Sequence, residues 1–148
     1  MDFNTSDKIA LLALLVAVLA AIYARWSSLE AEKANQISLI NGRKEIYLAF
    51  INLKMHMLQQ RQGAQLTEVS KFYHHTITAH LFFPASLAKK IQDYYDACFW
   101  LADSYQLNGD ATLENSNKDK QSKYLDTQSG LSLTIDTEIL KLFKALNN

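Results

Sequence analysis

The chain has very little of the residues that interrupt helices or cross-link folds. Its 148 residues include four glycines, one proline and one cysteine. A lone cysteine, Cys98, excludes an intrachain disulfide and fits a reducing compartment. Scarce glycine and proline indicate a chain that is nearly all helix. We expect the interruptions between helices at Gly42, Gly63, Pro84, Gly109 and Gly130.

The sequence also lacks an excess of charge of either sign. Fifteen basic and 15 acidic side chains give a formal net charge of zero. Because nucleic-acid-binding domains are usually strongly basic, we expect no direct sequence-specific binding of nucleic acid. The sequence contains no P-loop, no glycine-rich dinucleotide motif and no nucleophile elbow. We therefore expect no enzymatic activity, no catalytic residue and no cofactor.

Three histidines in "HHTITAH" are the strongest candidates for a metal site: His74, His75 and His80. Metal ligands on one helix are usually three or four residues apart, whereas His75 and His80 are five apart. No HExxH motif, CxxC motif or matching carboxylate pair accompanies them. We therefore expect no metal site, and we interpret these residues as packed or hydrogen-bonded histidines.

Cys98 and its aromatic neighbours in "YYDACFW" are also expected to be structural. A catalytic thiol needs a base and an oxyanion hole, and the sequence places neither beside Cys98. Without a basic groove, the nearby aromatic residues indicate core packing rather than base stacking. This expected core cluster contains Tyr94, Tyr95, Phe99, Trp100 and Tyr105.

What the sequence does contain is one long apolar segment near its start. The sixteen residues Ile9–Ala24 carry no charge. As a helix they rise about 24 Å, and extension to Trp26 brings the length close to a hydrocarbon core of about 30 Å. We expect a transmembrane helix here. Its expected interface residues are Lys8, Tyr23, Arg25 and Trp26.

Two alternatives to a membrane span remain open. A secretion signal would have a basic N-terminal region, but Met1–Lys8 contains Asp2 and Asp7 against one lysine, although Val18–Ala20 is a marginal cleavage pattern. An apolar segment of this length is also compatible with a buried helix of a soluble protein. If the segment spans the inner membrane, the excess of Lys and Arg after residue 24 predicts its orientation. The N-terminus would lie outside, and the C-terminal part of the chain would lie in the cytoplasm.

Small residues recur along this segment at alternating spacings of three and four. Such a repeat puts them on one face of a helix, and small residues let helices approach closely in lipid. A single-pass protein has no second transmembrane helix of its own, so we expect a second copy or another protein to pack there. This small-residue stripe contains Ala10, Ala13, Ala17, Ala20, Ala24, Ser27, Ala31, Ala34 and Ser38.

The remaining chain predicts an all-α fold. We expect the first helix to end near Asn41-Gly42, and further helices over 43–62, 64–83, 85–108 and 131–148. The expected inner faces include Ile46, Phe50, Leu53 and Met57; Leu66, Val69, Tyr73, Ile77, His80 and Leu81; Leu87, Ile91, Tyr94, Tyr95, Cys98, Leu101, Ala102 and Tyr105; and Ile135, Ile139, Leu142, Phe143 and Leu146.

The predicted organisation has three parts. Residues 1–26 form an N-terminal tail and transmembrane helix, and residues 27–42 form a helical stalk. Residues 43–148 form a small antiparallel bundle in the cytoplasm, with a polar loop over 108–130.

Three segments of the chain resemble small bacterial proteins with one N-terminal membrane helix. They are "EIYLAF" (Glu45–Phe50), "AHLFFPASLAKKI" (Ala79–Ile91) and "LKLFKAL" (Leu140–Leu146). Some proteins of this kind look like membrane-acting effectors of bacterial anti-phage systems, including retrons. There, a reverse transcriptase and its DNA–RNA product hold the toxin inactive. The resemblance thus implies a toxin-like effector with an inhibitory partner, and it carries over no catalytic residue.

The sequence is therefore consistent with three functions. The leading hypothesis is a non-enzymatic effector that binds lipid, forms homo-oligomers or binds an inhibitory protein, and perturbs the inner membrane when released. The second is a structural or sensory adaptor that the membrane helix only localises. The third is a soluble bundle whose apolar first helix is covered by a partner.

Overall fold

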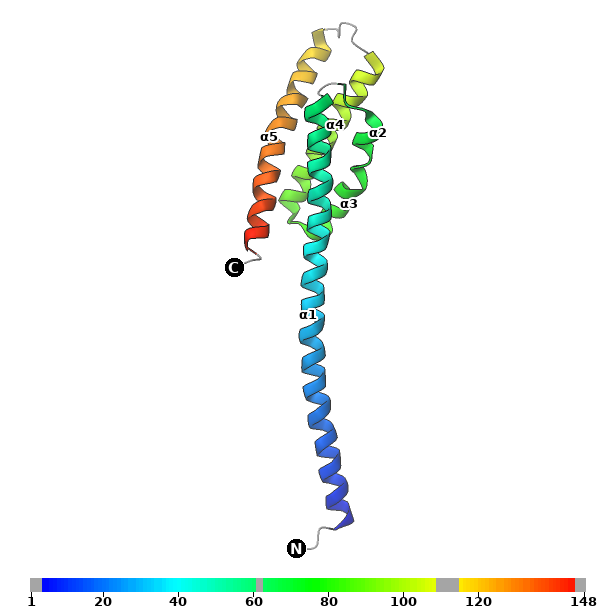
Figure 1. The fold of residues 1–148 in the computed structure, drawn as a ribbon, viewed down its shortest axis with the longest axis vertical. Helices are drawn as coiled ribbons and strands as arrows, with labels where there is room; N and C mark the ends of the chain where they lie inside the picture. Colours follow the sequence, from blue (N-terminus) through cyan, green and yellow to red (C-terminus); the bar gives the residue numbers. More distant parts are fainter. Residues whose placement is uncertain (1–3, 61–62, 109–114, 146–148) are drawn as a thin grey trace. The chain divides into compact units, whose positions relative to one another are not determined.

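A computed structural model describes residues 4–60, 63–108 and 115–145. These residues form α1 (Thr5–Gln60), α2 (Leu66–Ser70), α3 (Tyr73–Phe82), α4 (Ala85–Asn108) and α5 (Asn115–Ala145). No strand occurs in these ranges, so the all-α prediction is confirmed: one long apolar N-terminal helix is followed by a helical bundle (Figure 1).

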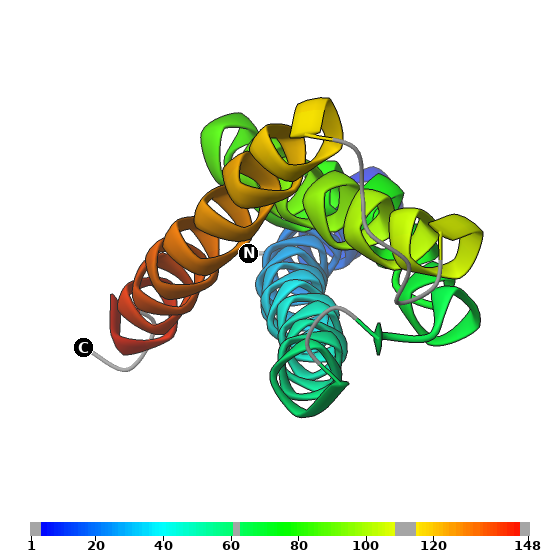
Figure 2. The same cartoon turned by 90° about the horizontal axis from the view of Figure 1, so that it is seen from above.

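The chain divides into two compact units, Met1–Asn41 and Gly42–Asn148. The first unit is a single segment of α1. In the second, α4 packs against α2, α3 and α5. Its α1 segment runs between α5 and the short helices α2 and α3. α1 and α4 run in the same direction, and α5 runs in the opposite direction (Figures 1 and 2).

The core of the second unit follows the predicted inner faces on three helices. Ile46, Phe50, Leu53 and Met57 of α1 are 5% exposed or less, and Ile135 and Ile139 of α5 are fully buried. On α4 the buried positions recur at helical spacing, as predicted. The predicted positions that are buried are Leu87, Ile91, Tyr94, Tyr95, Cys98, Leu101 and Ala102, and Ala88 and Ala97 are buried beside them.

The predicted helix end at Asn41-Gly42 is wrong, because α1 continues through both residues. A glycine inside a helix costs only about 1 kcal/mol relative to alanine, which other contacts can offset. Here the lack of a side chain has a packing role. A Cβ added at Gly42 would lie 2.6 Å from Cζ of Phe82, so the absence of a side chain lets the Phe82 ring lie against α1.

The predicted single helix over 64–83 is two helices, and its predicted inner face is wrong in the second one. The chain turns at Lys71 and Phe72, where Phe72 N–H donates to Val69 O at 3.1 Å. α3 then buries the small residues Thr76 and Ala79, while Tyr73, Ile77 and Leu81 are 52–75% exposed. Thr76 can be buried because its hydroxyl donates to the carbonyl oxygen of Tyr73 at 2.7 Å.

Pro84 separates α3 from α4, as the sequence predicts. Phe83 is extended, at φ −120° and ψ 156°, which is the conformation favoured before a proline. The Pro84 carbonyl oxygen then accepts the N–H groups of Leu87 and Ala88, both at 2.9 Å. Pro84 thereby starts α4 without requiring an N–H of its own.

The predicted polar loop over 108–130 is wrong for residues 115–130, because α5 begins at Asn115. The first half of α5 has few apolar residues, but several of its side chains contact α4. Tyr124 stacks on Trp100 with ring centroids 4.4 Å apart, and Gln128 donates to the Tyr94 hydroxyl at 3.2 Å. Residues 109–114 of the predicted loop, and Leu146 of the predicted inner face, lie outside the described residues.

Candidate functional site: an uncovered apolar segment and three surfaces of the bundle

The apolar segment of α1 is uncovered by the rest of the described chain. Ile9, Leu12, Val16 and Leu19 are 63–65% exposed, and no part of the most apolar window is buried. Among the described helices, α1 is the one long and apolar enough to cross a membrane, and its most apolar window of 18 residues has a mean hydropathy of 2.2. Its length and composition therefore make it a candidate membrane span.

The predicted interface residues all belong to α1. Tyr23 is 68% exposed and Trp26 59%, and Arg25 is also exposed. Aromatic rings at one end of an apolar segment are typical of a membrane–water interface. The side chain of Lys8 lies outside what the structure describes.

Every member of the small-residue stripe lies on α1 and is exposed. No other described helix packs on Ala10, Ala17 or Ala24, for example. Three members of the stripe, Ser27, Ala31 and Ala34, line a hollow of about 540 Å³ together with Glu30, Lys33 and Ile37.

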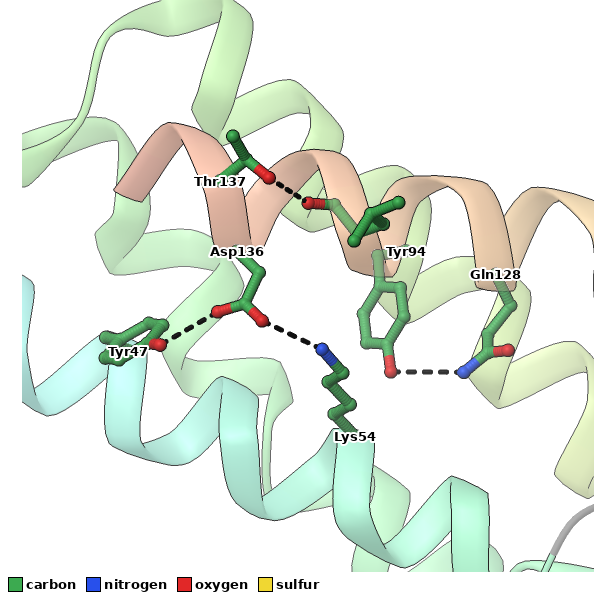
Figure 3. A network of polar contacts seen from close by, with 7 residues as sticks. Tyr47, Lys54, Tyr94, Gln128, Asp136 and Thr137 are labelled. Carbon is green, nitrogen blue, oxygen red and sulfur yellow. Dashed lines mark hydrogen bonds and ion pairs between the residues drawn. The ribbon is translucent and has the colours of Figure 1, made fainter. Parts of the chain in front are cut away.

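A half-buried polar network joins α1 to α5 in the bundle (Figure 3). Asp136 accepts a hydrogen bond from the Tyr47 hydroxyl at 2.8 Å and forms an ion pair with Lys54 at 2.9 Å. Burial raises the pKa of Asp136, but these two donors and the charge of Lys54 outweigh it and hold the pKa below its usual range. Burial and the same carboxylate raise the pKa of Tyr47 to about 12.

Asp136 holds α5 against α1 from a position far from the end of its helix. Its carboxylate lies in the interior of α5, 21 residues after the first residue of that helix. Lys90 and Glu138 form a comparable ion pair between α4 and α5. These contacts fix the position of α5 relative to α1 and α4, so we assign them a structural role.

The histidines do not assemble into a metal site. Within residues 4–60, 63–108 and 115–145, no three His, Cys, Asp or Glu side chains lie close enough to hold an ion. His74 and His80 are exposed. The prediction that His80 belongs to the inner face of its helix is therefore wrong. His75 is half-buried beside Phe72, and burial is the main cause that lowers its pKa.

A cavity of about 270 Å³ lies between α1 and the α2–α3 segment, and sequence reasoning did not anticipate it. It is lined by Ala49, Asn52, Leu53, His56, Glu68, Lys71, Phe72 and His75. Its charged groups are already paired, because Lys71 donates to Glu68 at 2.6 Å. His56 accepts the backbone N–H of Gln65 at 3.2 Å and so holds the start of α2.

Cys98 is a buried free thiol, as predicted. Burial raises its pKa to about 12, and a hydrogen bond with Tyr94 opposes this only slightly. The thiol is therefore protonated at neutral pH and has low reactivity in the folded chain.

The predicted aromatic core cluster is only partly correct. Tyr94 and Tyr95 are buried, but Phe99 and Tyr105 are 37% and 38% exposed. Trp100 is partly buried against Tyr124 of α5. Phe99 and Trp100 line a surface at which α3, α4 and α5 meet, whereas Tyr105 lies beside residues 63–67. Residues from three helices contribute to this surface, so no local sequence pattern could have revealed it.

Comparison with known proteins adds no relative. The chain matches no protein-family profile, and no curated protein or solved structure is similar enough to count as a match.

Proposed function

We propose that the chain is a non-enzymatic, membrane-anchored helical protein whose apolar α1 segment spans the inner membrane. One observation carries this proposal: the largely apolar side chains from Ile9 to Trp26 are exposed, so in water their apolar surface would contact the solvent. Lipid would remove this apolar surface from water, at about 25 cal/mol per Å². The lysines and arginines after residue 24 support an orientation with Gly42–Asn148 in the cytoplasm.

The sharper form of this proposal is a toxin-like effector of bacterial anti-phage defence. It would associate with further copies through the small-residue stripe and perturb the inner membrane when a partner releases it. Two features support this form: the exposed stripe on the uncovered part of α1, and the three segments that resemble small bacterial membrane proteins, some of which look like such effectors. The inhibitory partner would be a protein, such as a reverse transcriptase bound to its nucleic-acid product.

An adaptor function is the second candidate, and one feature of the bundle favours it. Tyr73, Ile77 and Leu81 occupy one exposed face of α3, at a spacing of four residues. Exposed apolar faces of this kind commonly mark binding surfaces for other proteins. For an adaptor, the membrane helix would only determine location.

Expression in bacteria with a membrane-potential dye tests the effector. We expect carbonate-resistant membrane association, and depolarisation when the chain is expressed without its partner. The structure offers a matched pair of variants in adjacent positions. Ala20→Leu fills the small-residue stripe, whereas Ala21→Leu makes the same change beside it. We expect loss of depolarisation for Ala20→Leu and retention for Ala21→Leu.

Other results favour the other candidates. The adaptor would be supported if Ala20→Leu and Ala21→Leu caused equal depolarisation. It would also be supported if the chain kept full function with an unrelated Leu-rich span in place of Ile9–Ala24. Complete extraction of the wild-type chain by carbonate would contradict a membrane span. That result would instead support a soluble bundle whose first helix is covered by a partner.

A further inference from the structure

A cavity of about 420 Å³ opens where α3, α4 and α5 meet, and its lining is chemically unusual. Five aromatic rings and a single carboxylate form it: Tyr73, Tyr95, Asp96, Phe99, Trp100 and Tyr124. The cavity is separate from the apolar segment of α1 and from the polar network around Asp136. It belongs entirely to the second compact unit.

The rings form walls at several angles. Tyr95 lies 5.7 Å from Tyr73 and 5.8 Å from Phe99 between ring centroids, with ring planes inclined by 45° and 43°. Trp100 and Tyr124 stack nearly parallel, 4.4 Å apart and inclined by 22°. These rings together give the cavity an aromatic lining, and the face of each ring carries a negative potential.

This surface is accessible from solvent. Tyr73 is 52% exposed and Phe99 37%, while Tyr95 at 7% forms the buried floor. Rings that served only as core would be covered as Tyr94 is, with no exposed surface. The cavity therefore offers aromatic surface to a molecule from outside.

Asp96, the one carboxylate that lines the cavity, forms no ion pair with the side chains that the structure describes. Asp96 is exposed, and its Oδ1 accepts a hydrogen bond from the Gln92 amide at 2.9 Å. The ion pairs found across the described residues involve Asp136, Glu68, Asp93 and Glu138, and none of them involves Asp96. The cation placed over a ring in these same residues is Arg43, which lies over Phe83 and not over this cavity.

We propose that this cavity binds a small organic cation that carries an alkylated ammonium group, such as a trimethylammonium group. Such a cation is weakly hydrated, so it loses little on leaving water and gains attraction to several ring faces. The carboxylate of Asp96 supplies the opposite charge at the edge of the site. This binding site does not depend on the function proposed above.

Choline and its neutral analogue 3,3-dimethylbutan-1-ol give the direct test, because they have similar shapes and differ in charge. Calorimetric titration uses the full chain in a maltoside detergent, which has no ammonium group. We expect choline to bind roughly tenfold more tightly than the alcohol, because the attraction to ring faces requires the charge. Equal affinities, or no binding of choline, would overturn the proposal.

A matched pair of variants on α4 locates the binding. Asp96→Asn keeps an oxygen for the Gln92 amide but removes the charge from the cavity, whereas Asp93→Asn removes an equal charge about one turn away. We expect Asp96→Asn to weaken choline binding roughly fivefold, and Asp93→Asn to change it little. Equal weakening by both variants would contradict a local site.

A third variant tests the aromatic wall. Tyr73→Leu removes an exposed ring, so the fold should tolerate it, and unchanged circular dichroism and thermal unfolding verify this. We expect it to weaken choline binding about fivefold while leaving the affinity for the alcohol nearly unchanged. An equal loss for both ligands would show an apolar site without cation selectivity and would overturn the proposal.

Nanodiscs distinguish the two sources of such a cation. With the chain in phosphatidylglycerol, added choline should bind as it does in detergent. A weaker apparent affinity in phosphatidylcholine would identify the lipid headgroup as a ligand of the same cavity, because it would compete with choline. Equal affinity in both lipids would identify a free cation in solution.

Discussion

Leu15 and Leu53 belong to the same helix, yet Leu15 is 52% exposed and Leu53 only 4%. The two residues have the same side chain and the same helical backbone. They differ in their neighbours, because Leu53 belongs to the core cluster of the second unit and Leu15 has no covering helix in the described chain. An apolar helix therefore becomes core only where other elements supply apolar partners, and elsewhere lipid or another chain must supply them.

The same substitution in both places should have very different effects. Leu53→Ala should destabilise the second unit by about 2–5 kcal/mol, because it removes buried contacts and leaves a cavity. Leu15→Ala should change the stability of that unit by less than about 0.5 kcal/mol. Unfolding of the detergent-solubilised chain, followed by tyrosine fluorescence and circular dichroism, measures both. Similar effects would show that the two units unfold together.

Two glycines inside helices sharpen the comparison between packed and open surfaces. Gly42→Ala should destabilise the bundle by about 1–3 kcal/mol, because its Cβ would collide with the Phe82 ring. Gly130→Ala should stabilise it by about 0.5–1 kcal/mol, because no atom lies within 4 Å of the added Cβ and alanine favours the helix. Thermal unfolding of the two variants checks the opposite signs. Stabilisation by both would mean that the Phe82 ring moves aside at no cost.

The polar network around Asp136 should make the stability of the second unit sensitive to acid, and the uncharged apolar segment should not show this sensitivity. Because folding lowers the pKa of Asp136, its stabilising effect is present above the usual pKa of 3.8 and is lost as pH falls through the lower folded value. Asp136→Asn should cost about 1 kcal/mol at neutral pH. It should also reduce the acid dependence of unfolding. Asp126→Asn, at an exposed position of α5, is the control and should change neither quantity.

Much of the bundle follows from helical periodicity in the sequence. Ile46, Phe50, Leu53 and Met57 recur at spacings that place large apolar residues on one face, and that face is the buried one. The Phe83-Pro84 pair likewise predicts a helix boundary, because proline restricts both its own conformation and that of the preceding residue.

The errors arise where tertiary contacts decide between local alternatives. The larger apolar residues of α3 predict its inner face, but close packing against α4 favours Thr76 and Ala79, which are small. The polar start of α5 lacks a hydrophobic pattern, and contacts from Tyr124 and Gln128 to α4 accompany its helical conformation. The aromatic cavity requires residues from α3 and α5 beside those of α4, which only the fold brings together.

The buried position of Cys98 gives the chain an internal reporter of its own opening. This thiol is the only one in the sequence, it is fully buried, and its raised pKa of about 12 keeps it protonated. An alkylating reagent reacts with the thiolate and therefore modifies Cys98 almost only in molecules whose α4 has become exposed. The rate of Cys98 alkylation then measures how often the bundle opens. The native thiol suffices for this measurement in detergent, in membranes or in living cells.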